Sequence, residues 1–262
     1  MSSTAPLPEP LLELRGINKS FGAVHVLHDV DFAVYPGQVT ALVGDNGAGK
    51  STLVKTIAGI HAAESGQRYF DGRPVQIDGP RDASALGIEV VYQDLALCDN
   101  LDIVENMFLG REELKGVVLD EHTMEARARQ TLASLSVRTV KSVRQSVSSL
   151  SGGQRQTVAI AKSVLWNSKV VLLDEPTAAL GVAQTKQVLE LVRRLADQGL
   201  GVVLISHNMV DVFEVADRIT ALYLGRVAAD VAAADVTHSQ VVELITAGRS
   251  GDLGLTSTTT IA

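Results

Sequence analysis

A glycine-rich loop near the start of the chain has the residues needed to bind nucleotide phosphates. It matches the motif G-x-x-x-x-G-K-[ST] through Gly44, Asp45, Asn46, Gly47, Ala48, Gly49, Lys50, Ser51 and Thr52. Glycines let successive backbone N–H groups converge on phosphate oxygens, while the following helix points its positive end at them. Lys50 is expected to contact the β and γ phosphates, and the Ser51 hydroxyl to ligate Mg²⁺. A glycine turn without a ligand is the alternative, which the complete motif disfavours.

Two acidic residues, Asp174 and Glu175, follow the apolar run at 170–173. An acid at the end of a short apolar strand projects from the carboxyl edge of a parallel sheet, where α/β folds bind ligands. Asp174 is therefore expected to contact Mg²⁺ directly or through its second shell. A solvated turn before Pro176 is the alternative for this pair considered by itself.

A third segment, Leu150-Ser151-Gly152-Gly153-Gln154, lies about twenty residues before these acids. It precedes an amphipathic stretch, so a serine and two glycines stand at a helix N-terminus. Such a terminus can bind an anion. A simple N-cap with a glycine turn is the alternative for an isolated Ser-Gly-Gly.

The surrounding pattern predicts the elements that position these segments. Residues 11–34 alternate apolar and polar positions, as antiparallel strands do. A strand at 38–43 runs into the glycine loop and a helix at 50–60. The region 93–149 is helical and more polar, with Asp120 as an N-cap, and strands return at 170–173 and 202–205. Thr237 and Gln240 form a capping-box signature for a last short helix. The pattern predicts a parallel α/β sheet with an inserted helical lobe.

Composition excludes several classes of protein. The 262 residues carry a net charge of −7 and no basic tract, which disfavours nucleic acid as a partner. The single cysteine, Cys98, cannot form an internal disulfide. No apolar run approaches the roughly 20 residues that a membrane span requires. Residues 1–10 are expected to be a flexible leader, and 248–262 a flexible tail.

Along the chain, the glycine-rich loop comes first, the segment 150–154 second and the acidic pair third. Three motifs in this chain order resemble those of the ATP-binding cassette (ABC) family, and the resemblance covers residues 12–229. It implies an α/β P-loop NTPase (RecA-like) core with an N-terminal antiparallel β subdomain and an inserted α-helical subdomain. A single ATPase domain is expected over 11–247. The core and β subdomain would occupy about 11–92 and 160–235, and the helical subdomain about 93–159. ATP and Mg²⁺ are the cofactors that the resemblance implies.

The resemblance also implies roles for single residues. Glu175 would be the general base that polarises the attacking water. Gln93, after the apolar stretch at 90–92, would reach the metal and this water. His207 would contact the γ phosphate, and Lys50 would act with these catalytic residues.

Phe21 matches the family position that stacks on adenine, with Val26 packing nearby. Without the resemblance, Phe21 is equally consistent with an ordinary core residue. The remaining histidines show no comparable placement and are interpreted as surface or packing residues: His25, His28, His61, His122 and His238.

In the family, the signature faces away from its own phosphate loop and binds ATP held by a second cassette. The resemblance therefore implies that the signature residues complete a partner's site; they are Leu150, Ser151, Gly152, Gly153 and Gln154. Because this chain has one cassette, the pair would come from two copies, a homodimer, or from a second subunit. Gly181 departs from the aspartate common in the family at this position, which leaves the coupling between two sites open.

Stretches at 44–47, 104–112 and 176–181 are most similar to ATPases of bacterial monosaccharide importers of the ribose, xylose and fructose type. This similarity implies a peripheral location at the cytoplasmic face of the membrane. Its implied partners are integral-membrane permease subunits and, indirectly, an extracellular sugar-binding protein. The alternatives are a soluble, non-transport ABC ATPase and a cassette for a different substrate. The former usually has tandem cassettes, long inserts or basic arms, which this sequence does not show.

Residues 95–110 would form part of the groove that receives a cytoplasmic helix of the membrane subunit. The apolar residues of this region could equally be core of the helical lobe; they are Leu97, Leu101, Ile103 and Phe108. Both interpretations remain open from the sequence.

Overall fold

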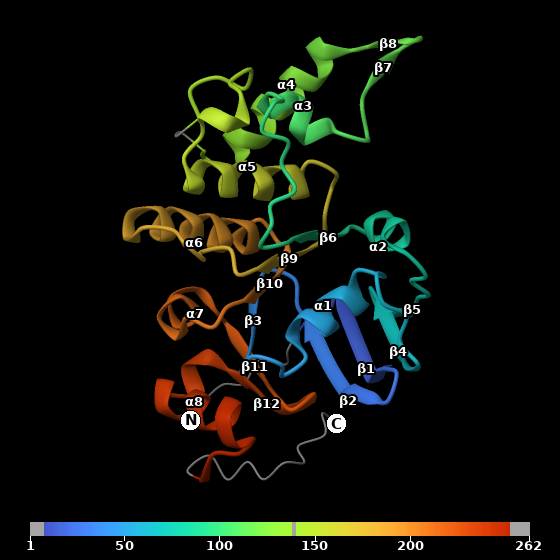
Figure 1. The fold of residues 1–262 in the computed structure, drawn as a ribbon, viewed down its shortest axis with the longest axis vertical. Helices are drawn as coiled ribbons and strands as arrows, with labels where there is room; N and C mark the ends of the chain where they lie inside the picture. Colours follow the sequence, from blue (N-terminus) through green and yellow to red (C-terminus); the bar gives the residue numbers. More distant parts are fainter. Residues whose placement is uncertain (1–7, 138–139, 252–262) are drawn as a thin grey trace.

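A six-stranded sheet forms the centre of the computed structural model, which describes residues 8–137 and 140–251. Its strands, in the order β12-β11-β3-β10-β9-β6, are β3 (Val39–Gly44), β6 (Ile88–Val91), β9 (Val170–Asp174), β10 (Gly201–Ile205), β11 (Arg218–Tyr223) and β12 (Arg226–Ala232). Neighbouring strands are parallel except β11 and β12. Because β3 and β9 flank β10, the motifs that follow them share one edge of the sheet (Figure 1).

An antiparallel sheet beside the central sheet contains the N-terminal strands. In the order β2-β1-β4-β5, they are β1 (Leu12–Phe21), β2 (Val24–Val34), β4 (Ser65–Phe70) and β5 (Arg73–Pro74). Alternation along β1 buries Leu12 and Leu14 on one face. The predicted N-terminal antiparallel subdomain is confirmed.

The central sheet separates two apolar cores, because successive side chains of a strand point to opposite faces. Leu172 of β9 lies in the core shared with α1 (Lys50–Ile57) and the antiparallel sheet. Leu173 lies in the core shared with α6 (Val182–Asp197) and the helical lobe. The phosphate-loop helix and α6 therefore cover opposite faces of the sheet.

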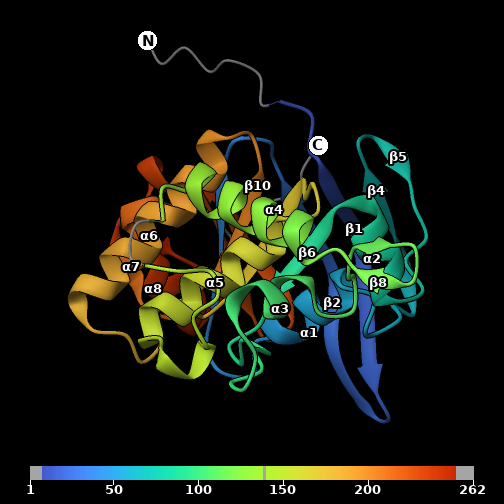
Figure 2. The same ribbon diagram turned by 90° about the horizontal axis from the view of Figure 1, so that it is seen from above.

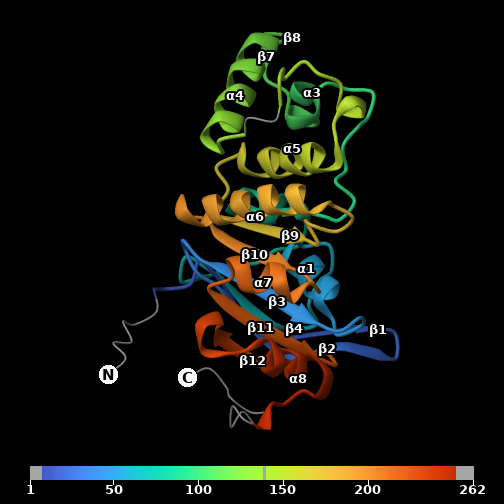
Figure 3. The same cartoon turned by 90° about the vertical axis from the view of Figure 1, so that its left-hand side faces the viewer.

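A lobe of helices stands on the α6 side of the sheet (Figures 2 and 3). It contains α3 (Ile103–Phe108), α4 (Glu121–Ser134), α5 (Gly152–Val164), a 3₁₀ turn (Val147–Ser149) and a short hairpin of β7 (Leu114–Lys115) and β8 (Val118–Leu119). Asp120 caps α4 by accepting the Thr123 N–H at 3.1 Å, as predicted. The inserted helical subdomain is confirmed, and the expected boundary between residues 159 and 160 falls inside α5.

The apolar residues of 95–110 divide between the two interpretations. Ile103 and Phe108 are fully buried in the lobe and belong to its core. Leu97 and Leu101 are only half-buried. The core interpretation is therefore confirmed for Ile103 and Phe108.

Three further helices complete the fold. They are α2 (Pro80–Leu86), α7 (Met209–Val215) and α8 (His238–Ala247), with a 3₁₀ turn at Ala233–Asp235. The predicted capping box begins α8, since the Thr237 N–H donates to Gln240 Oε1 at 2.8 Å. Helices α7 and α8 pack against β3 and β11 in a third apolar cluster.

Most of the expected leader and tail lies outside the described residues. Ser250 is described; it is buried, and its hydroxyl donates to Glu243 Oε2 at 2.9 Å. Packing contacts therefore continue past Gly248. Within residues 8–137 and 140–251, we find no helix with both the length and the apolar character needed to cross a membrane.

Candidate active site

Glycines shape the loop between β3 and α1 where a side chain would collide with its surroundings. Gly49 has φ +105°, and a Cβ there would lie 2.8 Å from Leu27 Cδ2 and 3.3 Å from the Val26 carbonyl oxygen. A Cβ on Gly44 would lie 2.6 Å from the Leu222 carbonyl oxygen. The loop is therefore packed closely against β2 and β11, with its backbone at the start of α1 arranged as a phosphate loop requires.

Lys50 folds its side chain back over this loop. Its ammonium donates to the Gly44 carbonyl at 2.7 Å and to the Asp45 carbonyl at 3.1 Å. Burial lowers the pKa of Lys50, while the charges of Glu175, Asp45 and Asp174 act in the opposite direction. The ammonium therefore lies within electrostatic reach of both predicted acids.

The other residues of the phosphate loop differ in solvent exposure. Asp45, Asn46, Gly47 and Ser51 are exposed, whereas Ala48 is buried and Thr52 is half-buried. Ser51 lies in the first turn of α1.

Asp174 ends β9 in a half-buried position. Burial raises its pKa, the neighbouring Glu175 raises it further, and Lys50 and Lys55 oppose the shift. Burial raises the pKa of Tyr92, and the charge of Asp174 raises it further. The segment after β6 therefore reaches the same edge of the sheet, and the exposed Gln93 follows Tyr92 directly.

Glu175 and His207 meet at this edge. Asp174 pairs with Ile205 in the ladder between β9 and β10, so the residues that follow both strands are neighbours. His207 Nδ1 lies 2.8 Å from Glu175 Oε2. The Glu175 side chain is 16% exposed and that of His207 72%. The sequence predicted each residue separately, and the structure brings them together.

The backbone of Glu175 is unusual, with φ +50°. Its N–H donates to the Ile205 carbonyl at 2.9 Å. A non-glycine residue in the left-handed region costs free energy, and such residues cluster at functional sites.

Phe21 lies at the end of β1 and is 45% exposed, so the core interpretation is wrong. The His61 ring packs edge-on against it, with 5.0 Å between ring centroids. Val26 is half-buried on β2, with its carbonyl close to Gly49 as described above. An aromatic face is thus available beside the strand that supports the phosphate loop.

The segment 150–154 begins α5 as predicted. The Ser151 N–H donates to Gln154 Oε1 at 2.9 Å, and the Gln154 N–H donates to Ser151 Oγ at 3.4 Å, a reciprocal capping box. A Cβ on Gly153 would lie 3.0 Å from Gln184 Cβ, so this glycine allows α5 to approach α6 closely. Leu150 is buried in the lobe, while Ser151 and Gly152 are exposed.

The start of α5 and the phosphate loop belong to different layers. Helix α6 lies between α5 and the central sheet, and α1 lies on the other side of that sheet (Figures 1 and 3). The structure therefore brings together Lys50, Asp174, Glu175 and His207. It holds the signature apart from them.

Comparison with known proteins explains this arrangement. A family model described as ABC transporter matches residues 27–178, more than half of the chain. The chain belongs to the ABC transporter family. Solved ABC cassettes share its fold: a nucleotide-free ATP-binding cassette has a TM-score of 0.75 at 25% identity, with 85% of this chain and 91% of that chain covered.

Curated relatives of this ABC cassette include sugar-import ATP-binding proteins. A fructose import ATP-binding protein of Rhizobium meliloti is 46% identical, with 92% of this chain and 95% of the relative covered. A xylose/arabinose import ATP-binding protein of Sulfolobus acidocaldarius is 44% identical, with 94% and 97% covered. A ribose import ATP-binding protein of Rubrobacter xylanophilus is 42% identical, but the chain spans only 48% of its length. As a member of this family, the cassette is an ATPase that uses ATP.

The sequence did not reveal a polar cluster behind the active site. The buried Asp211 accepts hydrogen bonds from the buried Thr177 and the exposed Asn208, which belong to the loops that carry Glu175 and His207. The only sequence signal for this cluster is an aspartate in the largely apolar helix 209–215.

Proposed function

We propose that this ABC cassette hydrolyses Mg-ATP at a site completed by a second cassette and thereby drives import of a monosaccharide through a membrane permease. The observation that carries this proposal is the contact between Glu175 and His207, 2.8 Å apart beside the phosphate loop. The sugar-import relatives, which align over nearly the whole chain, support the substrate class.

Three oxygen donors of this region would hold a magnesium ion. They are the Ser51 hydroxyl, the Gln93 amide and the Asp174 carboxylate. Mg²⁺ prefers one or two protein carboxylates together with nucleotide phosphates and water. When bound, Mg²⁺ would neutralise charge on the phosphates.

The chain's own residues would perform hydrolysis. The Lys50 ammonium, now bonded to two loop carbonyls, would bind the β and γ phosphates. The Glu175 carboxylate would accept a proton from the attacking water as general base. His207, held by Glu175, would contact the γ phosphate and stabilise the charge that develops on it. Phe21 would stack on adenine, with Val26 beside it.

A second cassette would supply the signature. The N-terminus of α5, with Ser151 exposed at its cap, would bind the γ phosphate of ATP held by the partner's phosphate loop. In a symmetric pair of this chain, each phosphate loop would face the partner's signature, giving two composite sites.

A cavity of about 290 Å³ between the sheet and the lobe is the proposed contact with the permease. Its lining combines apolar side chains with two basic and two acidic residues, and it includes Leu95, Met107, Leu109, Trp166, Arg111, Lys162, Glu89 and Asp94. Lys162 is half-buried, and burial lowers its pKa. A cytoplasmic segment of the permease with apolar residues would fit the apolar walls of this cavity. The cassette would then lie at the cytoplasmic face of the membrane, and an extracellular sugar-binding protein would act through the permease.

The substitution Glu175→Gln tests the chemistry. Because it removes the base and keeps the shape, it should lower the rate of ATP hydrolysis about 100- to 1000-fold while ATP still binds. The variant should accumulate as an ATP-bound dimer in size-exclusion chromatography. Glu190→Gln on α6, away from the site, is the matched control. A wild-type rate of ATP hydrolysis in Glu175→Gln would contradict the assignment of Glu175 as general base.

A transport assay separates import from the soluble alternative. Cells that lack this gene should lose uptake of a labelled monosaccharide, with fructose, xylose and ribose as the probes. Wild-type protein should restore uptake, and Glu175→Gln should not. Unchanged uptake of all three sugars would favour a different substrate or a non-transport role.

A further inference from the structure

Asp211 is a buried carboxylate to which the proposed mechanism gives no role. It lies in the first turn of α7 and is only 4% exposed. A buried carboxylate is costly unless hydrogen-bond donors surround it. The groups that donate hydrogen bonds to Asp211 therefore indicate why the fold retains a carboxylate at this position.

Both carboxylate oxygens of Asp211 accept a hydrogen bond from an active-site loop. Oδ2 accepts from the Thr177 hydroxyl at 2.6 Å, and this contact is buried. Oδ1 accepts from the Asn208 side-chain amide at 2.9 Å. Thr177 is two residues after Glu175, and Asn208 is one residue after His207.

The loop after Glu175 needs such support, because two of its residues have left-handed backbone conformations. These are Glu175 with φ +50° and Ala179 with φ +60°. Two short-range bonds lie within the loop, from the Ala178 N–H to the Glu175 carbonyl at 3.1 Å and from the Leu180 N–H to the Thr177 carbonyl at 3.2 Å, and the bond from the Glu175 N–H to the Ile205 carbonyl ties the start of the loop to β10. Left-handed conformations of non-glycine residues persist only where surrounding contacts hold them. The bond from the Thr177 hydroxyl to Asp211 connects this loop to helix α7, outside the loop.

The loop of His207 is held in a matching way. The Asn208 N–H donates to Ser206 Oγ at 3.0 Å, and Asn208 Oδ1 accepts the Val210 N–H at 3.0 Å as the cap of α7. Ser206 is fully buried. The backbone on both sides of His207 is thus fixed relative to Asp211.

We propose that Asp211 is a positioning residue for ATP hydrolysis. Through Thr177 and Asn208 it sets the distance between the two loops at which the Glu175 carboxylate meets the His207 ring. The inference rests on the proposed roles of Glu175 and His207. Asp211 itself touches neither ATP nor water in this mechanism.

Removal of the Thr177 hydroxyl tests this role with the smallest change. Thr177→Val keeps the side-chain shape and should lower kcat about 10- to 100-fold, the cost of displacing a catalytic group by roughly 1 Å. Nucleotide affinity should change less than about twofold, because the phosphate loop lies elsewhere. Thr177→Ser keeps the hydroxyl and should restore kcat. Asp211→Asn, which can no longer accept from both donors, should behave like Thr177→Val.

Two measurements on the full chain separate positioning from a general loss of structure. The NMR signals of the His207 ring nitrogens should shift in Thr177→Val and return in Thr177→Ser. In single-turnover assays, Thr177→Val should cost little further rate when His207→Ala is already present, because both changes remove the same contact. Additive losses, or a His207 ring that does not respond, would overturn the proposal.

The outcome also distinguishes this inference from the proposed function. If Glu175→Gln is inactive while Thr177→Val hydrolyses ATP at the wild-type rate, only the role of Asp211 is wrong. If Glu175→Gln hydrolyses ATP normally, the proposed base and the inference built on it both fail.

Discussion

The catalytic edge of the central sheet and the helical lobe with the signature are held by different kinds of contact. At the edge, Asp174 and Glu175 follow a strand whose apolar side chains are fully buried, between two neighbouring strands of the same sheet. Lys50 is fixed by backbone carbonyls of its own loop. The catalytic edge therefore depends on apolar packing and on the sheet ladder, with the buried Asp211 linking the loops that follow Glu175 and His207.

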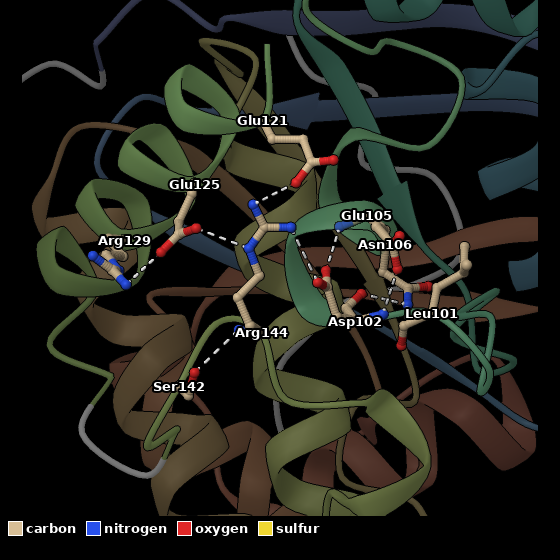
Figure 4. A network of polar contacts seen from close by, with 9 residues as sticks. All are labelled: Leu101, Asp102, Glu105, Asn106, Glu121, Glu125, Arg129, Ser142 and Arg144. Atoms are coloured by element: carbon tan, nitrogen blue, oxygen red, sulfur yellow. Dashed lines mark hydrogen bonds and ion pairs between the residues drawn. The ribbon is translucent and has the colours of Figure 1, made fainter. Parts of the chain in front are cut away.

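The lobe adds to its apolar core a set of polar and ionic contacts between segments. Arg144 lies at the centre of a network with three carboxylates, at 2.8 Å from Glu125 Oε2, 3.1 Å from Glu121 Oε2 and 3.3 Å from Asp102 Oδ2 (Figure 4). Buried Asn106 accepts the Cys98 N–H at 2.7 Å and donates to the Asp102 carbonyl at 2.9 Å.

An ion pair connects the segment before α3 to α5, the helix that begins at the signature. Arg155, the residue after Gln154, lies 3.0 Å from Asp99 Oδ1. Arg155 also donates to the Ser148 carbonyl at 3.3 Å. The start of α5 is therefore located in part by partly exposed ionic side chains, whereas the catalytic edge is located by strands and by the buried Asp211. We infer that changes in the two regions should separate signature function from nucleotide binding.

Ser151→Asp should give the largest effect and act on turnover alone. Aspartate is as good an N-cap as serine, so α5 should remain intact. Its negative charge would face the γ phosphate of a partner's ATP, and hydrolysis should fall about 100- to 1000-fold. Binding of ATP to the phosphate loop, followed by fluorescence titration, should not change. Ser151→Asn, neutral and equally good at capping, is the control; an equal loss in both variants would argue against an electrostatic role.

Lys50→Ala should instead weaken binding. Loss of charged hydrogen bonds to phosphate costs about 1.5 to 3 kcal/mol, which corresponds to about 10- to 100-fold in the dissociation constant of Mg-ATP. Lys115→Ala, on the exposed strand β7 of the lobe, should bind nearly as wild type does. Isothermal titration calorimetry measures both variants. Normal affinity in Lys50→Ala would contradict the phosphate-loop assignment.

Arg144→Ala should have the smallest effect and act on the lobe. Loss of three partly exposed ion pairs should lower the melting temperature by about 2 to 4 °C, since such pairs contribute modestly. The difference from wild type should shrink in 1 M salt, where charges are screened. Arg129→Ala, which removes one exposed pair with Glu125, is the control. A loss that high salt leaves unchanged would indicate that packing of the Arg144 stem holds the lobe.

Local sequence patterns account for the parts of the fold and of the site that the sequence could predict. The phosphate loop, the carboxylates at the end of a strand, the helix start at 150–154 and the capping box of α8 are local patterns, in which a few adjacent residues determine the structure. These elements lie as predicted. The fold class followed from the order of strands and helices.

Contacts between distant segments were beyond local patterns. The meeting of Glu175 with His207 depends on the register that pairs Asp174 with Ile205. The link from Thr177 to Asp211 joins residues 34 positions apart. The β7–β8 hairpin has strands of two residues each, too short for a periodic signal. Phe21 could not be separated from a core residue until its exposure was known.

The central claim is that each active site combines the phosphate loop of one chain with the signature of another. Mixing two variants that each hydrolyse ATP poorly, Lys50→Ala and Ser151→Asp, tests it most directly, at an ATP concentration too low to saturate Lys50→Ala. A mixed dimer contains one intact site, from the phosphate loop of Ser151→Asp and the signature of Lys50→Ala. If subunits exchange freely and the two sites act independently, an equal mixture should recover about a quarter of wild-type ATP hydrolysis. An equal mixture that hydrolyses no more ATP than either variant alone, despite mixed dimers detected by native mass spectrometry, would contradict the claim.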